Sequence, residues 1–408
     1  LVERSIEGGR AHHHFKTKDK IQAFFPIMSG RYELAEASQG NTRLEVYFHP
    51  GHGARVDHMI WAMQRSLAYF EEHWGPYPHE TLRLAEVPGF AGAAFACSFP
   101  GGMMGFTDSM GFRCPQGDGA PIAFPARSSE LASAADVDPV LWTVAHEVAH
   151  QWWDSHVIAA MALGASFTSE SMAQYGSLCV LQQEYGDEMA LRVAEYNRER
   201  YLQGRRTADR KELPLVQIDE QSHVHYGKGY VAFHALAKLA GYEAINQACA
   251  QVIELYAGPK GSPVTSVTLL DHLLDELPEE LVAQAQGWFE EIYFLDGALS
   301  SASAEKDGEG RYVLKLEGSA QSLLADGDGE EAAEAFSGEL ELEISFAGKT
   351  PVVLVRAKCA AGTLRFQQTF DREPVHVELD PRLLHMDRDL SNNSLSVTRQ
   401  LAVTRNSQ

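Results

Sequence analysis

The 408-residue chain has few cysteines, few basic residues and no long hydrophobic run. Its five cysteines are odd in number and widely spaced, without a Cys-x-x-Cys pair, which argues against a disulfide framework or a zinc ribbon. Acidic residues outnumber basic ones by 56 to 34, and the formal charge of −22 argues against nucleic acid as a partner, because phosphate binding needs a basic surface. The longest uncharged run, residues 87–107, contains two prolines and five glycines and predicts strand and loop rather than a membrane span.

A hydrophobic content of 45% in a chain of this length predicts a folded protein of two or three domains. Leu1 begins the chain in mid-pattern, and no signal peptide is visible at the start. We therefore expect a soluble domain that is either a fragment or a mature form of a longer protein.

The N-terminal part of the chain mixes strand-like and helix-like patterns. Residues 1–52 carry strand-like runs, among them the alternating residues 44–48. Apolar side chains recur at helical spacing over residues 56–74, and residues 82–87 again predict a strand. Residues 115–128 are rich in Pro and Gly and predict a loop.

From Asp138 onward the pattern changes to helices and then to strands. Helices are expected over residues 138–153, 169–185, 187–202, 227–240, 243–256, 265–276 and 279–294. The small and polar residues 297–303 predict a linker. Strands are expected after it, over residues 312–316, 340–346, 352–357, 363–370 and 375–377. This last part of the chain predicts a small all-β domain.

One stretch, His146-Glu147-Val148-Ala149-His150, has the pattern of a metal site. Two histidines four residues apart lie on one face of a helix and can hold a single Zn²⁺, while the glutamate between them is left free to deprotonate a water. Asp138 as N-cap and Pro139 at the first helical position support a helix here. The alternative is a core helix that carries two histidines by chance.

A catalytic zinc takes three protein ligands and keeps one position open. Glu170 lies twenty residues after His150, near the start of the next expected helix, where a helix-turn-helix would bring it back over the first one. An equal alternative for this residue is an acid that stabilises the N-terminus of its own helix.

The residues around this pattern resemble the gluzincin zinc aminopeptidases, the family that includes aminopeptidase N and leukotriene hydrolase. The likeness rests on residues 146–153 (HEVAHQWW) and 168–175 (TSESMAQY), with nineteen residues between HExxH and the glutamate where the family usually has eighteen. This longer spacing, with the HQWW and SES-AQY patterns, is most similar to a branch fused to membrane permeases of the ABC-transporter type. Such a fusion would tether the chain to a bacterial inner membrane through a removed segment.

The resemblance implies a complete hydrolytic site. His146, His150 and Glu170 would hold one Zn²⁺ per chain. Glu147 would be the general base. Residues 226–229 (YGKG) match the family's Tyr-x-Lys-Gly, so Tyr226 would donate a hydrogen bond to the oxyanion that amide hydrolysis creates. Taken alone, this tyrosine would more often be a half-buried structural residue.

The resemblance covers most of the chain and implies an α+β fold. A mainly helical, thermolysin-like catalytic domain is expected over residues 53–298. Residues 1–52 would be the last strands of an N-terminal β domain, and residues 304–408 a C-terminal β domain. Residues 286–289 (QGWF) resemble the family's helix that ends in a Trp-Phe pair, which serves packing rather than chemistry.

The chain departs from the family where the family holds the free amine of its substrate. The family has a Gly-x-Met-Glu-Asn strand there, and the corresponding residues 96–104 (ACSFPGGMM) contain no acid. A substrate ammonium buried without a carboxylate would cost on the order of several kcal/mol. Either Glu86, Asp108 or another acid replaces the glutamate, or the enzyme does not select a free N-terminus. Three residues of this stretch are expected to bind substrate: Phe99, Gly101 and Gly102. The alternative for the two glycines is a plain turn, which such pairs form more often.

The sequence thus predicts a zinc metallopeptidase that is aminopeptidase-like and acts on peptides. One alternative is hydrolysis of a non-peptide bond, such as an epoxide, at the same site. Another is a regulatory or binding domain of a membrane transporter that keeps zinc for structure. The presence of Glu147 and Tyr226 favours an enzyme, because a structural zinc needs neither a base nor an oxyanion donor.

Overall fold

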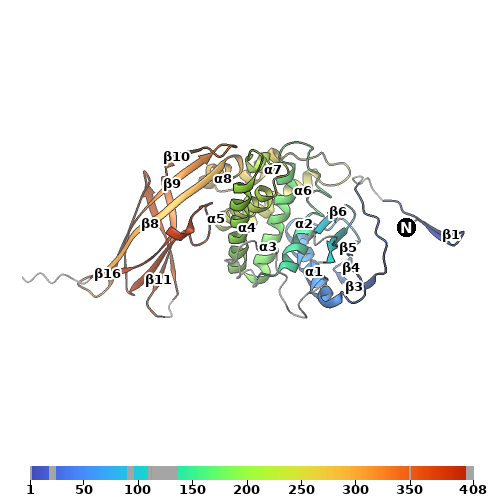
Figure 1. Ribbon diagram of the computed structural model, residues 1–408, viewed down its shortest axis with the longest axis horizontal. Helices are drawn as coiled ribbons and strands as arrows, with labels where there is room; N and C mark the ends of the chain where they lie inside the picture. The colour runs from blue at the N-terminus through green and yellow to red at the C-terminus, as the bar shows by residue number, and fades with distance from the viewer. Residues whose placement is uncertain are drawn as a thin grey trace, which may run out of the picture. The chain divides into compact units, whose positions relative to one another are not determined.

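The computed structural model describes residues 2–17, 24–89, 96–108, 112, 137–348 and 351–400. Strands near the N-terminus are followed by a run of helices and then by a second, larger set of strands, which Figure 1 shows from blue to red. This order confirms the predicted α+β class, with a mainly helical region between two β regions. The loop expected over residues 115–128 lies outside the described residues.

The N-terminal strands form two sheets, an isolated antiparallel hairpin and a mixed sheet of five strands in the order β3-β4-β5-β7-β6. Their bounds are β1 (Glu3–Glu7) and β2 (Arg10–His14) in the hairpin, and β3 (Glu33–Gln39), β4 (Thr42–Phe48), β5 (Thr81–Val87), β6 (Ala96–Phe99) and β7 (Met103–Thr107) in the mixed sheet. β4, β5 and β7 run parallel. Helix α1 (Val56–His73) makes the crossover from β4 to β5. β6 pairs with β7 in the antiparallel sense and, among the described residues, ends the sheet.

The helix and strands predicted for this region are present. β4 buries Leu44 and Val46, two alternate residues of the predicted strand. α1 buries Met63, Leu67 and Phe70 at helical spacing, and it packs on β3 and β4. The apolar face that the sequence shows is therefore the face that covers the sheet.

The central region consists of helices that begin and end close to their predicted limits. The α-helices are α2 (Pro139–Ala149), α3 (Met172–Tyr185), α4 (Asp187–Thr207), α5 (Gly229–Ala240), α6 (Tyr242–Tyr256), α7 (Ser266–Asp275) and α8 (Glu279–Glu290). Two π-helical segments, η5 (Phe167–Ser171) and η7 (His223–Lys228), lead into α3 and α5. Short 3₁₀ turns also occur in the described parts of the chain: η1 (Gly53–Arg55) before α1, η6 (Leu215–Gln217) between α4 and α5, and η8 (Leu390–Asn392) after β14. Within the described ranges, none of these helices has the length and apolarity that crossing a membrane requires.

The C-terminal strands form a nine-stranded sheet in the order β15-β14-β11-β12-β13-β9-β8-β16, with β10 paired to β9. They are β8 (Ile292–Lys306), β9 (Tyr312–Ala325), β10 (Glu331–Ala335), β11 (Gly338–Phe346), β12 (Val353–Ala360), β13 (Thr363–Phe370), β14 (Pro374–Leu379), β15 (Ser394–Ser396) and β16 (Thr398–Gln400). All five strands predicted after residue 304 are found here, which confirms a β-rich C-terminal part.

The predicted linker over residues 297–303 is wrong, because these residues lie inside β8 and pair with β9. Their small side chains serve packing instead. A Cβ on Gly297 would lie 3.0 Å from the Leu379 side chain, and Ala302 is buried in the core of this sheet. The same strand explains why α8 ends at Glu290 rather than at residue 294 as expected.

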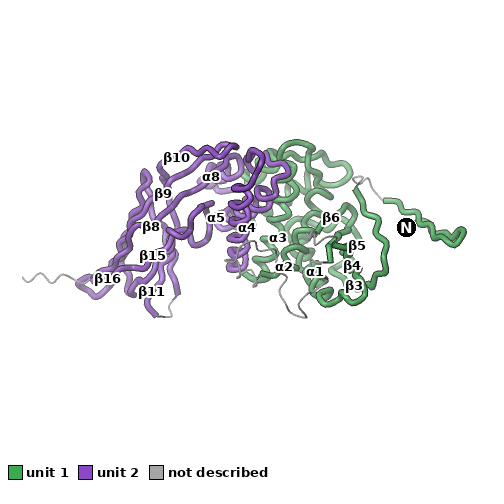
Figure 2. Tube along the Cα trace, viewed as in Figure 1, with its two compact units in different colours: residues 1–186, 243–276 green, residues 187–242, 277–408 purple. Residues whose placement is uncertain are grey.

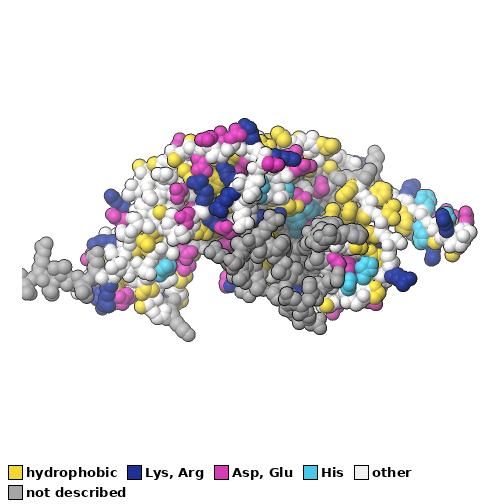
Figure 3. Space-filling view, in the orientation of Figure 1, with side chains coloured by type: hydrophobic (Ala, Val, Ile, Leu, Met, Phe, Trp, Pro, Cys, Tyr) yellow, Lys and Arg dark blue, Asp and Glu magenta, His cyan; other side chains and the backbone are white. Residues whose placement is uncertain are grey.

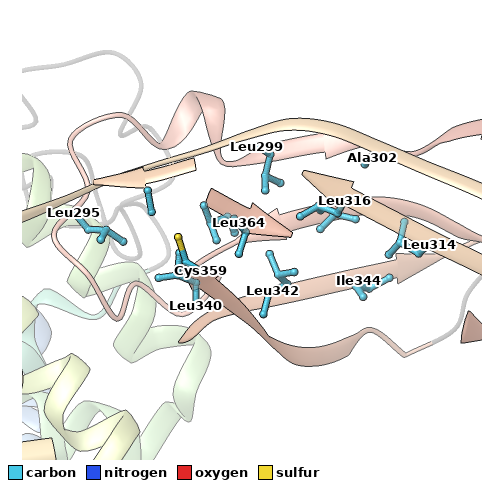
Figure 4. Close-up of a cluster of buried hydrophobic side chains, with 14 of the residues drawn as sticks. Leu295, Leu299, Ala302, Leu314, Leu316, Leu340, Leu342, Ile344, Cys359 and Leu364 are labelled. Atoms are coloured by element: carbon cyan, nitrogen blue, oxygen red, sulfur yellow. The ribbon is translucent and has the colours of Figure 1, made fainter. Parts of the chain in front are cut away.

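Leucine and isoleucine side chains from five strands make up most of the core of the C-terminal sheet. Figure 4 shows them pointing toward one another from strands far apart in sequence. Members of this core include Leu299 of β8, Leu316 of β9, Leu342 and Ile344 of β11, and Leu364 of β13. Burying such side chains is the main source of stability that this region has.

The chain divides into two compact units, shown in Figure 2. Unit 1 comprises residues 1–186 and 243–276, and unit 2 comprises residues 187–242 and 277–408. The domain boundaries expected after residues 52 and 298 stay a prediction. On the face shown in Figure 3, acidic side chains lie among Lys and Arg side chains rather than in one separate patch.

The fully buried Leu342 provides a test of the C-terminal core. We expect Leu342→Ala to lower the free energy of unfolding of this sheet by about 2–5 kcal/mol, because the substitution leaves a cavity as well as losing burial. Urea denaturation followed by circular dichroism measures the change. Leu354→Ala on β12, where the side chain is 46% exposed, is the control and should cost less than about 0.5 kcal/mol. Similar losses for both variants would contradict the core described here.

Candidate metal centre

Helix α2 begins where its sequence predicts, and it carries His146 within the helix and His150 as its C-cap residue. The Asp138 carboxylate accepts hydrogen bonds from the backbone N–H groups of Val140 and Leu141, at 3.1 and 3.0 Å. This N-cap satisfies two donors that a helix start leaves open. One helical turn then separates His146 from His150, and their Nε2 atoms lie 3.2 Å apart. The predicted helix is thus present, although it ends at Ala149 rather than at residue 153.

Glu170 reaches both imidazoles from η5. Its Oε2 atom lies 3.2 Å from His146 Nε2 and 3.3 Å from His150 Nε2. In the described part of the chain, this is the group of His, Cys, Asp and Glu side chains that could hold a metal ion, with ligand atoms all within 4.8 Å of one another. The structure therefore brings together the three residues that the sequence predicted as ligands.

The distances among these three atoms fit a tetrahedral zinc. Zinc bonds of 2.0–2.2 Å at tetrahedral angles place neighbouring ligand atoms about 3.3–3.6 Å apart. The three separations of 3.2, 3.2 and 3.3 Å lie close to the short end of that range. Two nitrogens and one oxygen are also a ligand set that zinc accepts in catalytic sites.

The backbone carbonyl of Trp153 orients the second histidine. His150 Nδ1 lies 3.3 Å from this oxygen, which can only accept a hydrogen bond, so Nδ1–H donates and Nε2 faces the other ligands. Asp154, the residue after Trp153, is exposed and has a φ of +86°, a backbone conformation that is strained for a residue other than glycine.

The charges of the cluster are coupled. Burial alone would lower the pKa of His150, but the negative charge of Glu170 outweighs it and raises this pKa to about 9. Burial likewise opposes ionisation of Glu170, and the two imidazoles overcome it and hold the pKa of Glu170 well below its usual range. Without a metal, the cluster therefore holds a proton at neutral pH, in the place where a cation would bind.

Glu147 has the properties of a general base. Its side chain is buried, and its Oε2 atom has no hydrogen-bond partner among the described residues. Burial raises the pKa of Glu147 to about 7, while the charge of His150 opposes this effect and that of Glu170 adds to it. A carboxylate with a pKa near neutrality can take up a proton and release it again at physiological pH.

The predicted substrate-binding residues lie on the β6–β7 hairpin, and Gly102 is needed there for structural reasons. It has a φ of +78°, and a Cβ would lie 2.2 Å from the Thr81 carbonyl oxygen. Its N–H and its carbonyl are both used in hydrogen bonds within the protein. Gly101 has a φ of +90° in the turn, and the Phe99 ring packs on Phe24 at a centroid distance of 5.0 Å.

The two acids that flank this hairpin in sequence are also engaged. Glu86 is fully buried, accepts a hydrogen bond of 2.7 Å from the His49 N–H, and contacts His52 Nδ1 at 2.5 Å. Asp108 accepts a hydrogen bond of 3.2 Å from the Gly89 N–H. The Glu86 carboxylate thus holds the loop between β4 and α1 through His49 and His52.

Tyr226 lies in η7 of unit 2, whereas the three potential ligands lie in unit 1. The Arg200 guanidinium stands 4.5 Å from the centre of its ring, and the His225 ring packs edge-on at 4.3 Å. A role for Tyr226 beside a metal stays a prediction. The sequence did not indicate that its segment, or that of Glu170, is π-helical. Such segments are frequent at functional sites, because they re-aim one side chain within a helix.

The chain is similar to aminopeptidases in sequence and in fold. No family model matches the chain. Endoplasmic reticulum aminopeptidase 2 of Homo sapiens is 22% identical over 261 residues, which cover 62% of this chain and 25% of that protein. The crystal structure of Legionella pneumophila aminopeptidase A in complex with aspartic acid superposes with a TM-score of 0.54 at 15% identity, covering 91% of this chain and 38% of that one. The chain has an aminopeptidase-like fold.

This aminopeptidase-like fold confirms the predicted fold class. The relation to aminopeptidases is distant, and the chain spans a quarter of the human relative and 38% of the Legionella structure. Neither likeness concerns permease-fused proteins, so that part of the predicted resemblance stays untested.

Removal of the carboxylate ligand is a direct test of the metal centre. We expect Glu170→Gln to weaken Zn²⁺ binding more than about 100-fold, because a neutral amide replaces a charged ligand. Competition with a chromophoric chelator measures the affinity. Glu72→Gln, the same chemical change at an exposed position of α1, is the control and should leave the affinity unchanged. Equal zinc binding by both variants would show that Glu170 is not a ligand.

The pH dependence of zinc binding follows from the proton on His150. Its pKa is raised to about 9, so below that pH the metal must displace a proton. We expect the apparent zinc affinity to rise by up to about tenfold per pH unit between pH 7 and 9 and then to level off. Calorimetry in buffers of different ionisation enthalpy should detect the released proton at pH 7. An affinity that does not change between pH 7 and 9 would contradict this charge state.

Proposed function

We propose that this protein is a zinc-dependent metallopeptidase that hydrolyses peptide bonds. The observation that supports this most is the cluster of His146, His150 and Glu170, whose ligand atoms lie within 4.8 Å of one another. The buried Glu147, with its pKa near 7, supplies the base that hydrolysis needs. The likeness to aminopeptidases supports the same class of reaction.

Four residues of unit 1 would have separate roles in hydrolysis, three as zinc ligands and one as the general base. His146, His150 and Glu170 would hold the zinc, which supplies positive charge that polarises the scissile carbonyl and makes water a better nucleophile. Glu147 would accept the proton from the attacking water. The same carboxyl group would then pass this proton to the nitrogen of the leaving amine.

Tyr226 is proposed as the donor to the oxyanion. Amide hydrolysis places negative charge on the carbonyl oxygen, and a phenol O–H aimed at that oxygen stabilises the transition state. The match of residues 226–229 to Tyr-x-Lys-Gly and the π-helical setting of this tyrosine support the assignment.

Peptides are the proposed substrates, and the net charge of −22 argues against nucleic acid as a partner. Phe99 and Gly101 are the residues of the β6–β7 hairpin that we propose for substrate contact, since both backbone groups of Gly102 bind within the protein. A permease-fused protein tethered to a bacterial inner membrane is the proposed larger context, supported by the HQWW and SES-AQY patterns.

Substitution of the base tests the proposed reaction. We expect the zinc-loaded chain to cleave members of a mixed peptide library, and Glu147→Gln to lower kcat by about 10²–10⁴-fold, because the amide cannot accept the proton from water. Mass spectrometry of the products measures the rate. Products shortened stepwise from the N-terminus would indicate an aminopeptidase, and internal cuts an endopeptidase.

The control for this experiment keeps the chemical change and moves it away from the centre. Glu72→Gln should retain the full rate, and zinc content should be the same in all three proteins. If the unsubstituted chain and Glu147→Gln are equally inactive while both hold zinc, the protein is not a peptidase.

A further inference from the structure

The residue directly after the second histidine is tied to the β6–β7 hairpin. Gln151 is fully buried. Its Oε1 atom accepts a hydrogen bond of 3.0 Å from the Gly102 N–H. Its Nε2 group donates to Ser98 Oγ and, at 3.3 Å, to the Phe99 carbonyl. One side chain thus binds both β6 and the turn that follows it, 49 to 53 residues away in sequence.

β6 depends on such a tie more than β7 does, because β7 also pairs with β5. The turn between β6 and β7 contains Gly101 and Gly102, both with positive φ, and two adjacent glycines make a turn flexible. β6 lies at the edge of the mixed sheet in the described part of the chain and has only β7 as a strand partner. Of the helices, α2 packs against β6, and Gln151 follows at the C-terminal end of that helix.

The choice of glutamine fits all of these partners at once. The Gly102 N–H needs an acceptor, whereas the Phe99 carbonyl needs a donor. A glutamine side chain offers both from one amide group. The hydrogen bond from the Gly102 N–H is buried, so losing it would leave a polar group unsatisfied. Gln151 directly follows His150 in the chain, so its hydrogen bonds connect β6 to the candidate metal centre through a single peptide bond.

We propose that Gln151 is a positioning residue that fixes the register between edge strand β6 and the metal-binding helix, so that an extended peptide lying along β6 presents one particular bond to the metal. This inference rests on the proposed function for its substrate. An edge strand binds an extended peptide through backbone hydrogen bonds, which give affinity without choosing a side chain. Cleavage of one bond then requires that the strand be held at a fixed distance from the catalytic groups, since a displacement of about 1 Å can cost 10²-fold in rate.

The test uses Gln151→Met and Gln151→Glu. Methionine keeps the approximate volume and removes every hydrogen bond, whereas glutamate keeps the acceptor for the Gly102 N–H and loses both donors. Gln251→Met is the matched control, because Gln251 also makes a side-chain hydrogen bond in unit 1, to Glu276 at 2.6 Å, between α6 and the end of α7.

Each variant is loaded with zinc and assayed on a hexapeptide and on a short amino-acid anilide that is too small to pair with a strand. We expect Gln151→Met to lower kcat/KM for the hexapeptide by about 10–100-fold and for the anilide by less than about 3-fold, with Gln151→Glu in between. Zinc affinity should match that of Gln251→Met, whereas the melting temperature of Gln151→Met should be lower, because the buried Gly102 N–H loses its acceptor. A loss that is equal for both substrates, or no loss for the hexapeptide, would overturn the proposal.

A binding experiment separates this inference from the proposed reaction. The hexapeptide is titrated onto zinc-loaded Glu147→Gln and onto Glu147→Gln combined with Gln151→Met, and the Kd values are compared. A Kd raised about tenfold or more in the double variant would support the positioning role even if the unsubstituted chain cleaved nothing. Equal Kd values, or no binding to Glu147→Gln, would overturn it, while cleavage by the unsubstituted chain would leave the proposed function in place.

Discussion

The close approach of one carboxylate to two imidazoles is the constraint on which the rest of this site depends. Holding Glu170 within 3.3 Å of both rings requires burial of charged groups, which is unfavourable unless each charge is paired. A proton shared within the cluster supplies this pairing when no metal is bound, and a divalent cation would supply it better. The raised pKa of His150, the lowered pKa of Glu170 and the fit to tetrahedral distances are therefore three consequences of one geometry.

The helices that carry these residues are held by a buried polar network as well as by apolar packing. Asn246 of α6 accepts hydrogen bonds from Trp74 Nε1 and from the Tyr175 hydroxyl, each at 3.0 Å, and donates one of 2.8 Å to the Tyr69 hydroxyl. It thereby joins α1, α3 and α6 within unit 1. Apolar contacts tolerate small shifts between helices, whereas directional hydrogen bonds in the interior do not. Such a network fixes α3, and with it the π-helical segment that presents Glu170.

The features that the sequence predicted correctly depend mostly on residues close together in the chain. The N-cap Asp138, the spacing of four between His146 and His150, and the apolar periodicity of α1 are each written in a few adjacent residues, and the structure has all of them. Features that depend on residues far apart in sequence were missed. The small residues from Gly297 to Ser303 look like a linker until β9 is known to pair with them, and a carbonyl such as that of Trp153 carries no side-chain signal for its role beside His150.

The β6–β7 hairpin, whose strand β6 packs against α2, has to be understood from its sequence and its contacts together. Its sequence lacks the acid that would hold a substrate amine, and the acids on either side are engaged elsewhere, Glu86 with His52 and Asp108 with Gly89. A cationic terminus bound against this hairpin would lack a counter-charge from it, unless a more distant acid such as Asp154 supplied one. Backbone hydrogen bonds must then carry more of the binding, and they select a bond only if the strand that offers them is fixed. Without the acid, selection of one bond depends more strongly on the position of β6, which the Gln151 amide group holds.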